Sequence, residues 1–375
     1  MKNDLMGLIF AENPEAAMGE LTSVRALAAI PFGGRYRIID FILSNMVNSS
    51  IINVGITTPY NYRSLSDHLG TGKDWDLDRK GNGLFILPPR EPGDISDIKS
   101  GIDIIHDISY FLSKSRKDYV LVTNCNTICN INYSEVLKFH LEHEADITLI
   151  YNEVGTLSSK ELTTRILLDV DRDETVRDIQ VYPIQQSSNF SYMHMFIIRK
   201  ELLLKLVGDA VAHNKHYISK DLLLPALDRF KVYGYKHEGY TRQIDNVKSF
   251  FSANLELLNK NIRDDLFGQK SDMPIYTKIK DSVPTRYCHS ADVSNSIVAD
   301  GCVIEGTVRN SILFRGVHIG KGATVENSII MQKSNIMDNC LIQNVIFDKE
   351  VVLRSGKKLV GQDTYPMVIG KKAII

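Results

Sequence analysis

The sequence predicts a chain of two architectures: an α/β domain over residues 1–262 and a parallel β-helix over residues 291–375, joined by a linker over 263–290. Two observations lead to this prediction. In the first part, short apolar runs alternate with segments of helical periodicity, which is typical of a mostly parallel sheet with helices on both faces. In the second part, aliphatic residues recur every six positions between small polar residues, the period of hexapeptide repeats.

Five apolar runs of the first part are expected to form strands: GLIFA (7–11), NVGITT (53–58), YVLVTN (119–124), ITLIYN (147–152) and MHMFIIR (193–199). Four segments have the apolar spacing of helices: DFILSNMVNSSI (40–51), SGIDIIHDISYFLSK (100–114), YSEVLKFHLEHEA (133–145) and VKSFFSANLELLNKNI (247–262). In such a sheet ligands bind beyond the carboxyl ends of the strands. We therefore expect the chemistry in the loops that follow GLIFA and YVLVTN.

The second part is identified by its period. Leu313, Ile319, Val325 and Met331 fall at six-residue intervals, as do the triplet Ile330, Ile336 and Ile342 and the pair Ile297 and Val303. Hexapeptide repeats of this kind coil into a parallel β-helix. Thr307 and Arg309 break the phase, so plain antiparallel β-structure is the alternative.

Composition sets the broad class of the protein. The chain has 375 residues, of which 43% are hydrophobic and 24% charged, and its formal net charge is −1. Nucleic acids and anionic membranes bind proteins with an excess of lysine and arginine, so we expect neither partner. No apolar run approaches the roughly 20 residues of a membrane helix. The short apolar run at the start is expected to be a buried strand, and the protein is expected to be cytoplasmic.

The five cysteines form no CxxC pair, and no histidine lies at zinc-ligand spacing from them. Cys125 and Cys129 are four residues apart in TNCNTICN, so one alternative is a site with two thiols. The favoured interpretation is that they are small buried residues of a reducing compartment.

The longest local motif is PFGGRYRIIDF at residues 31–41, followed by LSN at 43–45 and VNS at 47–49. With YVL at 119–121, PIYT at 274–277 and the hexapeptide repeats, it resembles the bacterial and plant ADP-glucose pyrophosphorylases over nearly the whole chain. The resemblance implies a Rossmann-like nucleotidyltransferase domain followed by a left-handed parallel β-helix. It also implies a reaction in which glucose 1-phosphate joins the AMP part of ATP.

The phosphate-binding part of that family's site is altered here. Nucleotidyl transfer needs backbone N–H groups and cations around the triphosphate. Where the family has a loop of the form GGxGxRL after the first strand, this chain has a single glycine, no arginine and three glutamates, Glu12, Glu15 and Glu20. The lysine of the family motif RAKP is Leu27. Acids in this place would repel ATP.

The metal and sugar-phosphate positions are altered in the same direction. By alignment with the family, the aspartates that resemble Mg²⁺ ligands correspond to Asn126 and Gln243, and the lysine of the motif EKP corresponds to Tyr182. An amide is a much poorer Mg²⁺ ligand than a carboxylate, and tyrosine does not neutralise a phosphate. We therefore expect no catalytic residue and no metal cofactor in this chain, although catalytic relatives use Mg²⁺.

Within the family this pattern resembles the GlgD-type regulatory subunit found beside a catalytic GlgC-type subunit. The resemblance implies a role in glycogen biosynthesis, a homologous catalytic partner and a heterotetramer. Two alternatives stay open. One is an active sugar-nucleotide pyrophosphorylase with an unusual site, and the other is a hexapeptide-repeat acyltransferase that uses His318.

Three arginines around Gly33 and Gly34 are candidates for an effector site: Arg25, Arg35 and Arg37. In the family a basic residue at the position of Arg35 resembles part of a pocket for phosphorylated sugar activators, and a nucleotide effector is the other option. The alternative interpretation is that these are surface or salt-bridged arginines. A basic tail could complete such a pocket, although a solvated rim is favoured for it: Arg354, Lys357, Lys358, Lys371 and Lys372.

Overall fold

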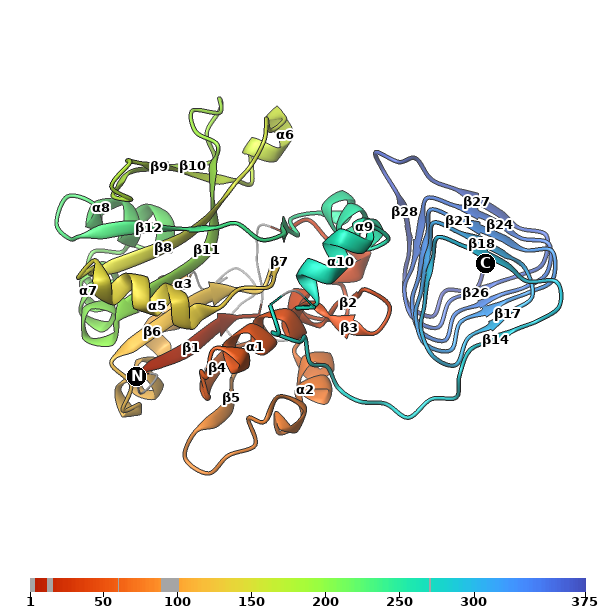
Figure 1. Cartoon of the computed structure of the whole chain (residues 1–375), viewed down its shortest axis with the longest axis horizontal. Coiled ribbons are helices and arrows are strands. Elements are labelled where there is room, and N and C mark those ends of the chain that lie inside the picture. Colours follow the sequence, from red (N-terminus) through yellow and green to blue (C-terminus); the bar gives the residue numbers. More distant parts are fainter. Residues whose placement is uncertain (1–3, 12–15, 60, 89–100, 270) are drawn as a thin grey trace. The chain divides into compact units, whose positions relative to one another are not determined.

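The computed structural model describes residues 4–11, 16–59, 61–88, 101–269 and 271–375, and these divide into two compact units (Figure 1). The sheet unit takes the described parts of 1–13, 42–62 and 70–241. The β-helix unit takes the described parts of 14–41, 63–69 and 242–375. The β-helix unit thus combines the repeats with an N-terminal segment and with the last helices of the α/β part.

The sheet unit is built on nine strands within the described residues, with β10-β9-β11-β6-β1-β4-β5 in order, β8 paired with β11, and β12 paired with β8. The strands are β1 (Leu5–Phe10), β4 (Asn53–Thr57), β5 (Gly83–Leu87), β6 (Tyr119–Asn124), β8 (Ile147–Glu153), β9 (Ile166–Val170), β10 (Val176–Val181), β11 (Phe190–Arg199) and β12 (Val232–His237). β1 is parallel to β4 and β6, whereas β11 is antiparallel to β6, β8 and β9. The sheet is therefore mixed, not mostly parallel, because β9, β10 and β11 follow one another without a helix between them.

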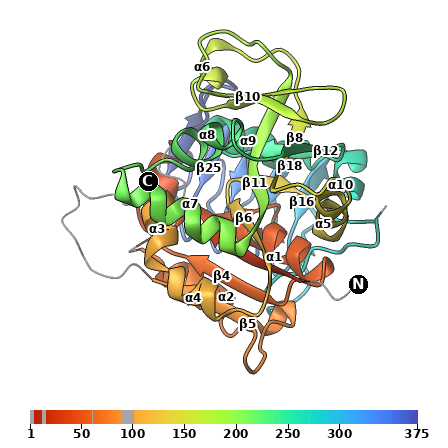
Figure 2. The same ribbon diagram turned by 90° about the vertical axis from the view of Figure 1, so that its left-hand side faces the viewer.

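Helices cover both faces of this sheet (Figure 2). They are α1 (Ile38–Asn48), α3 (Gly101–Asp107), α4 (Ser109–Lys114), α5 (Tyr133–Glu142), α7 (Lys200–Ala212) and α8 (Leu224–Ala226), whereas the short helix α6 (Ser159–Leu162) lies beyond the ends of β9 and β10. Met6 and Leu8 of β1 belong to one core cluster with residues of α3 and α7. An added Cβ on Gly7 would lie 2.5 Å from the Sδ atom of Met46 in α1, so a side chain at this position would displace the end of the Met46 side chain.

The β-helix unit contains three five-stranded parallel sheets, whose coils stack in Figure 1. The first sheet is β14 (Arg286–Tyr287), β17 (Val303–Ile304), β20 (His318–Ile319), β23 (Asn335–Ile336) and β26 (Val352–Leu353). The second is β15 (Asp292–Ser294), β18 (Thr307–Arg309), β21 (Thr324–Glu326), β24 (Leu341–Gln343) and β27 (Lys358–Val360). The third is β16 (Ile297–Val298), β19 (Ile312–Leu313), β22 (Ile329–Ile330), β25 (Val345–Phe347) and β28 (Met367–Ile369).

The predicted left-handed β-helix is confirmed, but its period is not a strict six. His318 pairs with Asn335 one coil later, a coil of 17 residues, whereas Val303 pairs with His318 across a coil of only 15. Buried core residues therefore follow one another at six, six and five positions: Leu313, Ile319, Val325, Ile330, Ile336, Ile342 and Phe347. The shorter coil explains why Thr307 and Arg309 break the phase, since Val308 between them is the buried residue.

Equivalent positions of successive coils stack in columns at the corners. At one corner the backbone is left-handed at asparagines with φ between 42° and 53°: Asn295, Asn310, Asn327 and Asn344. Asparagine tolerates this conformation better than other residues with a side chain. The Asn295 amide nitrogen donates to Asn310 Oδ1 at 2.7 Å, one coil above. Corner columns thus place equivalent side chains one strand spacing apart, about 4.8 Å.

The N-terminal segment packs inside the β-helix unit through the PFGGRYRIIDF motif. β2 (Pro31–Phe32) and β3 (Tyr36–Arg37) form a hairpin with Gly33 and Gly34 at its tip. The Gly33 N–H donates to Asn254 Oδ1 in α9 (Val247–Glu256) at 3.0 Å. An added Cβ on Gly34 would lie 3.3 Å from Ile297 of the first coil. The unit also contains α2 (Arg63–Leu69) and α10 (Lys260–Leu266).

Among the described residues, no helix combines the length and the apolar character that crossing a bilayer requires.

The short coil leads to a stability prediction. An added Cβ on Gly306 would lie 2.3 Å from the carbonyl oxygen of Ala323 and 2.7 Å from that of Gly320, both on backbone that cannot move aside. Gly306→Ala should lower the free energy of unfolding by about 1–3 kcal/mol in urea titrations. Gly155→Ala is the control, because nothing lies within 4 Å of its Cβ position. Equal stability of the two variants would contradict this account of the corner.

Candidate functional site

Two positions of the expected active site lie in the sheet unit, and neither carries a charge. Asn126 follows β6 and is fully buried. Tyr182 follows β10 with a left-handed φ of 54°, and its half-buried ring packs against the main core cluster. A carboxylate at position 126 would have to ionise in a fully buried place, which burial opposes.

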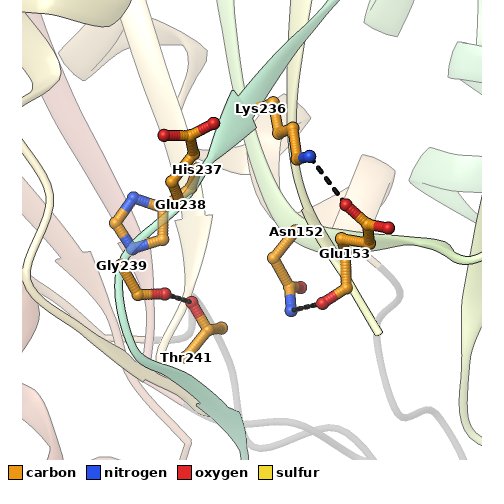
Figure 3. Close-up of a pocket in the computed structure, with 7 residues that line it drawn as sticks. All are labelled: Asn152, Glu153, Lys236, His237, Glu238, Gly239 and Thr241. Atoms are coloured by element: carbon orange, nitrogen blue, oxygen red, sulfur yellow. Dashed lines mark hydrogen bonds and ion pairs between the residues drawn. The ribbon is translucent and has the colours of Figure 1, made fainter. Parts of the chain in front are cut away.

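A polar cavity of about 300 Å³ opens at the carboxyl ends of β8 and β12 (Figure 3). It is lined by Asn152, Glu153, Lys236, His237, Glu238, Gly239 and Thr241. The Lys236 ammonium forms an ion pair with Glu153 at 2.7 Å, and Glu238 adds a second acid. Among the described residues that line the cavity, Lys236 is the one lysine, and its ion pair with Glu153 makes it a weak candidate for binding a phosphate.

Two further positions of the expected active site, Leu27 and Gln243, lie in the β-helix unit. Leu27 begins the 3₁₀-helix η2 (Leu27–Ala29) and is fully buried, so it replaces a cation with core packing. Gln243 is 5% exposed, and its Nε2 has no hydrogen-bond partner within the described part of the chain. Glu12 and Glu15 lie outside the described residues. Glu20 is exposed in η1 (Gly19–Leu21).

The residues at these positions do not fit Mg²⁺, which prefers carboxylate ligands. Over the ranges that the structure describes, no three His, Cys, Asp or Glu side chains come together as a metal site would require. Cys125 and Cys129 are buried and form no disulfide, and burial raises the pKa of Cys129 to about 12. A protonated thiol is neither a nucleophile nor a metal ligand, so the thiol-site alternative gains no support.

Arg25 has both terminal guanidinium nitrogens engaged by one carboxylate. Its Nη1 and Nη2 donate to Asp348 Oδ1 and Oδ2 at 2.9 and 2.7 Å, and the two residues are 2% and 0% exposed. In the preceding coils the place of Asp348 is taken by Ala299, Phe314 and Met331. A charge in this apolar column is tolerated only with a partner, and Arg25 is that partner.

Arg35 and Arg37 differ in their surroundings. Arg35 is exposed, and its guanidinium lies over the Tyr36 ring, 5.1 Å from the centroid. Arg37 is half-buried and donates from Nη1 to the Ser64 carbonyl at 2.6 Å. Burial lowers the pKa of Arg37 to about 10, against the opposing effect of Asp40. Asp40 Oδ1 lies 2.6 Å from Nε2 of His68, and Asp40 Oδ2 accepts a hydrogen bond from the backbone N–H of Arg37 at 2.9 Å.

Arg37 belongs to a group of basic residues that we name the cationic cluster: Arg37, Lys278, Lys280, Arg315, Lys333 and Lys349. They come from β3, the linker and one β-helix corner. Arg315 lies 3.5 Å from Asp300. Among the described residues the other five have no carboxylate within ion-pair distance, and Lys278 donates only to the Asp67 carbonyl, at 2.6 Å.

Corner columns bring the three β-helix members of the cluster together. Arg315, Gln332 and Lys349 occupy the same place in successive coils, and Lys333 follows Gln332. Two strand spacings, about 10 Å, therefore separate the backbones at Arg315 and Lys349. Like charges held this close repel one another unless an anion lies between them.

The pKa shifts in the cluster have the sign that this repulsion requires. The pKa of Lys349 is lowered to about 7, chiefly by burial and then by Arg37, Arg25 and Lys280, against the opposing effect of Asp348. Burial also lowers the pKa of Lys280, with Arg37 and Arg315 as the next causes. A multivalent anion would relieve both the desolvation and the repulsion. The cluster is thus suited to a phosphorylated ligand.

Sequence reasoning named Arg37 but missed the lysines of the cluster. The lysines could have been found from the coil register, because Lys333 and Lys349 are recognised as neighbours only when the number of residues in a coil is known. In the basic tail Lys372 is exposed, and its ammonium lies 3.7 Å from the Glu350 carboxylate. His318 has both ring nitrogens near partners, Asn335 Oδ1 at 3.0 Å and Glu305 at 3.5 Å, which does not favour an acyltransferase base.

Two families match the chain, and each covers one of the predicted parts. The family described as nucleotidyl transferase matches residues 18–260. The family described as GlmU-like, C-terminal hexapeptide, matches residues 282–365. Together they agree with the two architectures of the fold.

Curated relatives match over most of their length. A glycogen biosynthesis protein GlgD of Bacillus subtilis is 36% identical over 98% of this chain and 96% of its own. A protein of the same name from Geobacillus stearothermophilus is 38% identical over 87% of this chain and 84% of its own. A glucose-1-phosphate adenylyltransferase of that organism is 33% identical over 87% of this chain and 84% of its own.

The Arg25–Asp348 ion pair can be tested by stability measurements. Arg25→Ala leaves a buried carboxylate without its partner, and we expect the free energy of unfolding to fall by about 3–5 kcal/mol. In Arg25→Met/Asp348→Leu no buried charge is left, so the free energy of unfolding should fall less in the double variant than in Arg25→Ala. Both are compared by urea unfolding. A loss below about 1 kcal/mol for Arg25→Ala, as for an exposed pair, would contradict the assignment.

Proposed function

Because the chain belongs to the nucleotidyltransferase family that includes the GlgD proteins and the glucose-1-phosphate adenylyltransferases, we propose that it is a non-catalytic regulatory subunit. Its partner would be a homologous catalytic subunit that converts ATP and glucose 1-phosphate to ADP-glucose and pyrophosphate. The proposal includes a hetero-oligomer, with a heterotetramer as its expected form. It also includes a place in glycogen biosynthesis in the cytoplasm.

The observation that carries this proposal is the loss of charge at four positions of the family's site. Phosphoryl and nucleotidyl transfer depend almost entirely on positioning and on electrostatic stabilisation of the transition state. Asn126, Tyr182, Leu27 and Gln243 supply no charge, and Asn126, Leu27 and Gln243 are buried. These positions therefore supply neither the carboxylates that bind Mg²⁺ nor the cations that bind a triphosphate.

The cationic cluster supports the regulatory half of the proposal. Arg37 and Lys349 are half-buried and Lys280 is exposed, and within the described part of the chain no carboxylate lies within ion-pair distance of these three side chains. Arginine binds phosphate through two donors at once, and lysine adds a point charge. We therefore propose the cluster as the site of a phosphorylated effector, with Arg37 retained from the original candidates, Arg25 in a structural role and Arg35 at the exposed periphery.

Partial restoration of the active site tests the catalytic half. Asn126→Asp/Gln243→Asp should remain at least about 100-fold less active than a catalytic homologue, because the cations are still missing and a buried carboxylate resists ionisation. The assay is pyrophosphate release from ATP, glucose 1-phosphate and Mg²⁺ by the isolated chain. Robust turnover by the wild type alone would favour the alternative, an active pyrophosphorylase with an unusual site.

Kinetics of the mixed oligomer test the regulatory half. The chain is co-purified with a catalytic homologue, and activity is measured with and without phosphorylated sugars. Arg37→Gln/Lys280→Gln should raise the effector concentration that gives half of the full response by at least about tenfold, as expected for the loss of two charge-assisted contacts. Lys205→Gln, an exposed change in α7 outside the cluster and outside the basic tail, is the matched control. A response that is identical in all three mixtures would count against the cluster as effector site.

A further inference from the structure

One coil of the β-helix has a shorter corner than its neighbours. The corner between β20 and β21 spans the four residues 320–323, and the corner between β14 and β15 spans the four residues 288–291. The corner between β17 and β18, which lies between these two in the stack, contains only Glu305 and Gly306. Two residues are thus missing from one coil, whereas the coils on both sides are complete at this corner.

The missing residues are the middle pair of the corner. The strands on both sides of the corner, β17 and β18, pair in register with β20 and β21. Glu305 and Gly306 therefore correspond to the first and the last residue of the next corner, and no residue corresponds to its middle pair, Lys321 and Gly322. The gap leaves a cavity of about 430 Å³, which we name the corner notch. Its lining includes Ser290, Glu305, Lys321, Gly322, Asp338 and Asn339.

The gap also interrupts a ladder of backbone hydrogen bonds that runs along this corner. In the complete corners the third residue donates its N–H to the carbonyl of the second residue one coil earlier. Asn339 donates in this way to Lys321 at 3.0 Å, and Gly356 donates to Asp338 at 2.9 Å. Gly322 is also a third residue, but the coil before it has no second residue to accept. Within the part of the chain that the structure describes, the exposed Gly322 N–H forms no hydrogen bond, so the notch offers a backbone donor to an outside acceptor.

The spacing of the notch fits one further segment of polypeptide. Adjacent coils lie about 4.8 Å apart, so the complete corners on either side of the gap are separated by about 10 Å. A backbone placed midway lies at the ordinary hydrogen-bonding spacing from both corners. Its carbonyl can accept from Gly322 as the Lys321 carbonyl accepts from Asn339 in the next step of the ladder. Addition of a segment to an open backbone ladder is a recurring mode of peptide recognition.

The side chains of the notch favour a basic residue on that segment. Glu305 lies 3.5 Å from His318 Nε2, and Asp338 Oδ1 accepts from the Lys321 backbone N–H at 2.8 Å. Among the described residues, no lysine or arginine forms an ion pair with either carboxylate. Lys321 is the one basic residue of the lining, and it is exposed. Two acids and one base give the lining a net charge of −1, which attracts a cation.

We propose that the corner notch is a docking site for a turn of another polypeptide chain. The turn fills the missing corner with its backbone and places a lysine or arginine side chain beside Glu305 and Asp338. The notch lies at a different corner of the coil from the cationic cluster, so failure of this inference would leave the proposed function standing. A polysaccharide also fits a polar notch, but it brings no positive charge to the two carboxylates.

The experiment is an NMR titration of the isotope-labelled full chain with two tripeptides, each acetylated and amidated at its ends. One peptide has lysine between two glycines, and the other has glutamate there. The lysine peptide should shift the Gly322 amide signal and slow its exchange with deuterium at least about tenfold, because the N–H gains an acceptor. The glutamate peptide should bind at least about tenfold more weakly, and added salt should reduce this difference. Maltotriose is titrated as the saccharide probe.

A variant that fills the notch tests the role of the missing residues. Insertion of Asn-Gly between Glu305 and Gly306 gives this coil the four-residue corner of its neighbours and supplies a carbonyl for Gly322. The variant should remain folded in urea titrations and should no longer bind the lysine peptide. The matched control carries the same insertion after Gly155, an exposed residue of the sheet unit, and should bind as the wild type does.

A second pair of variants tests the charges without changing the length of the coil. Glu305→Gln/Asp338→Asn removes both carboxylates at nearly constant size, and it should weaken binding of the lysine peptide at least about tenfold. Asp363→Asn, a change of an exposed acid outside the notch, is the control and should leave the affinity unchanged.

Four results would overturn the inference. The first is a Gly322 amide signal that does not respond to millimolar lysine peptide, and the second is equal binding of the lysine and glutamate peptides. The third is binding that persists in the folded insertion variant, because the peptide then lies elsewhere. The fourth is a response of Gly322 to maltotriose and to neither peptide, which would make the notch a saccharide site.

Discussion

The β-helix unit is organised by one buried ion pair. Asp348 occupies a column that is otherwise apolar, and it is fully buried, so the coil is stable only if a cation reaches it. Arg25 reaches it from the N-terminal segment, 323 residues away in sequence. This contact holds the N-terminal segment against the coil that contains Asp348. Lys349 follows Asp348 in that coil, and Arg37 comes from the same N-terminal segment as Arg25. The cationic cluster depends on that juxtaposition.

The same physical chemistry explains the contrast between the family's catalytic positions and the cluster. At the former, charged groups have been replaced by neutral ones that bury easily, such as Leu27 in η2. At the latter, basic residues stay close together although burial lowers their pKa values. Holding unneutralised cations in place is unfavourable in the free protein. Such an arrangement is understandable if an anion completes it.

Sequence reasoning predicted both architectures and several elements closely, including β6, whose bounds it gave correctly. Its errors have physical causes. The sheet is mixed because β9 to β11 lack the helices that alternation requires. The strict six-residue period fails because the coils have 17 residues, or 15 around Val308, and not 18. In a 17-residue coil the core residue after Val325 is therefore Ile330 and not Met331.

The site was only partly predictable. Loss of charge at Asn126 and Gln243 is visible by alignment with the family, and Arg37 is visible in its motif. The lysines of the cluster are not, because a linker residue and two corner residues become neighbours only through the coil register. Asp348 did carry a signal, since an acid stands where other coils have Ala299, Phe314 or Met331. The partner of that acid requires the folded structure.

Equilibrium binding of Mg²⁺ and ATP to the isolated chain tests the central claim most directly. Dialysis with labelled ATP, with and without Mg²⁺, measures whether the family's site still recognises its nucleotide. The account predicts no binding at the family's site that depends on Mg²⁺, because the carboxylates and cations that such binding needs are absent there. Tight, Mg²⁺-dependent ATP binding that survives Arg37→Gln/Lys280→Gln would contradict a purely regulatory role.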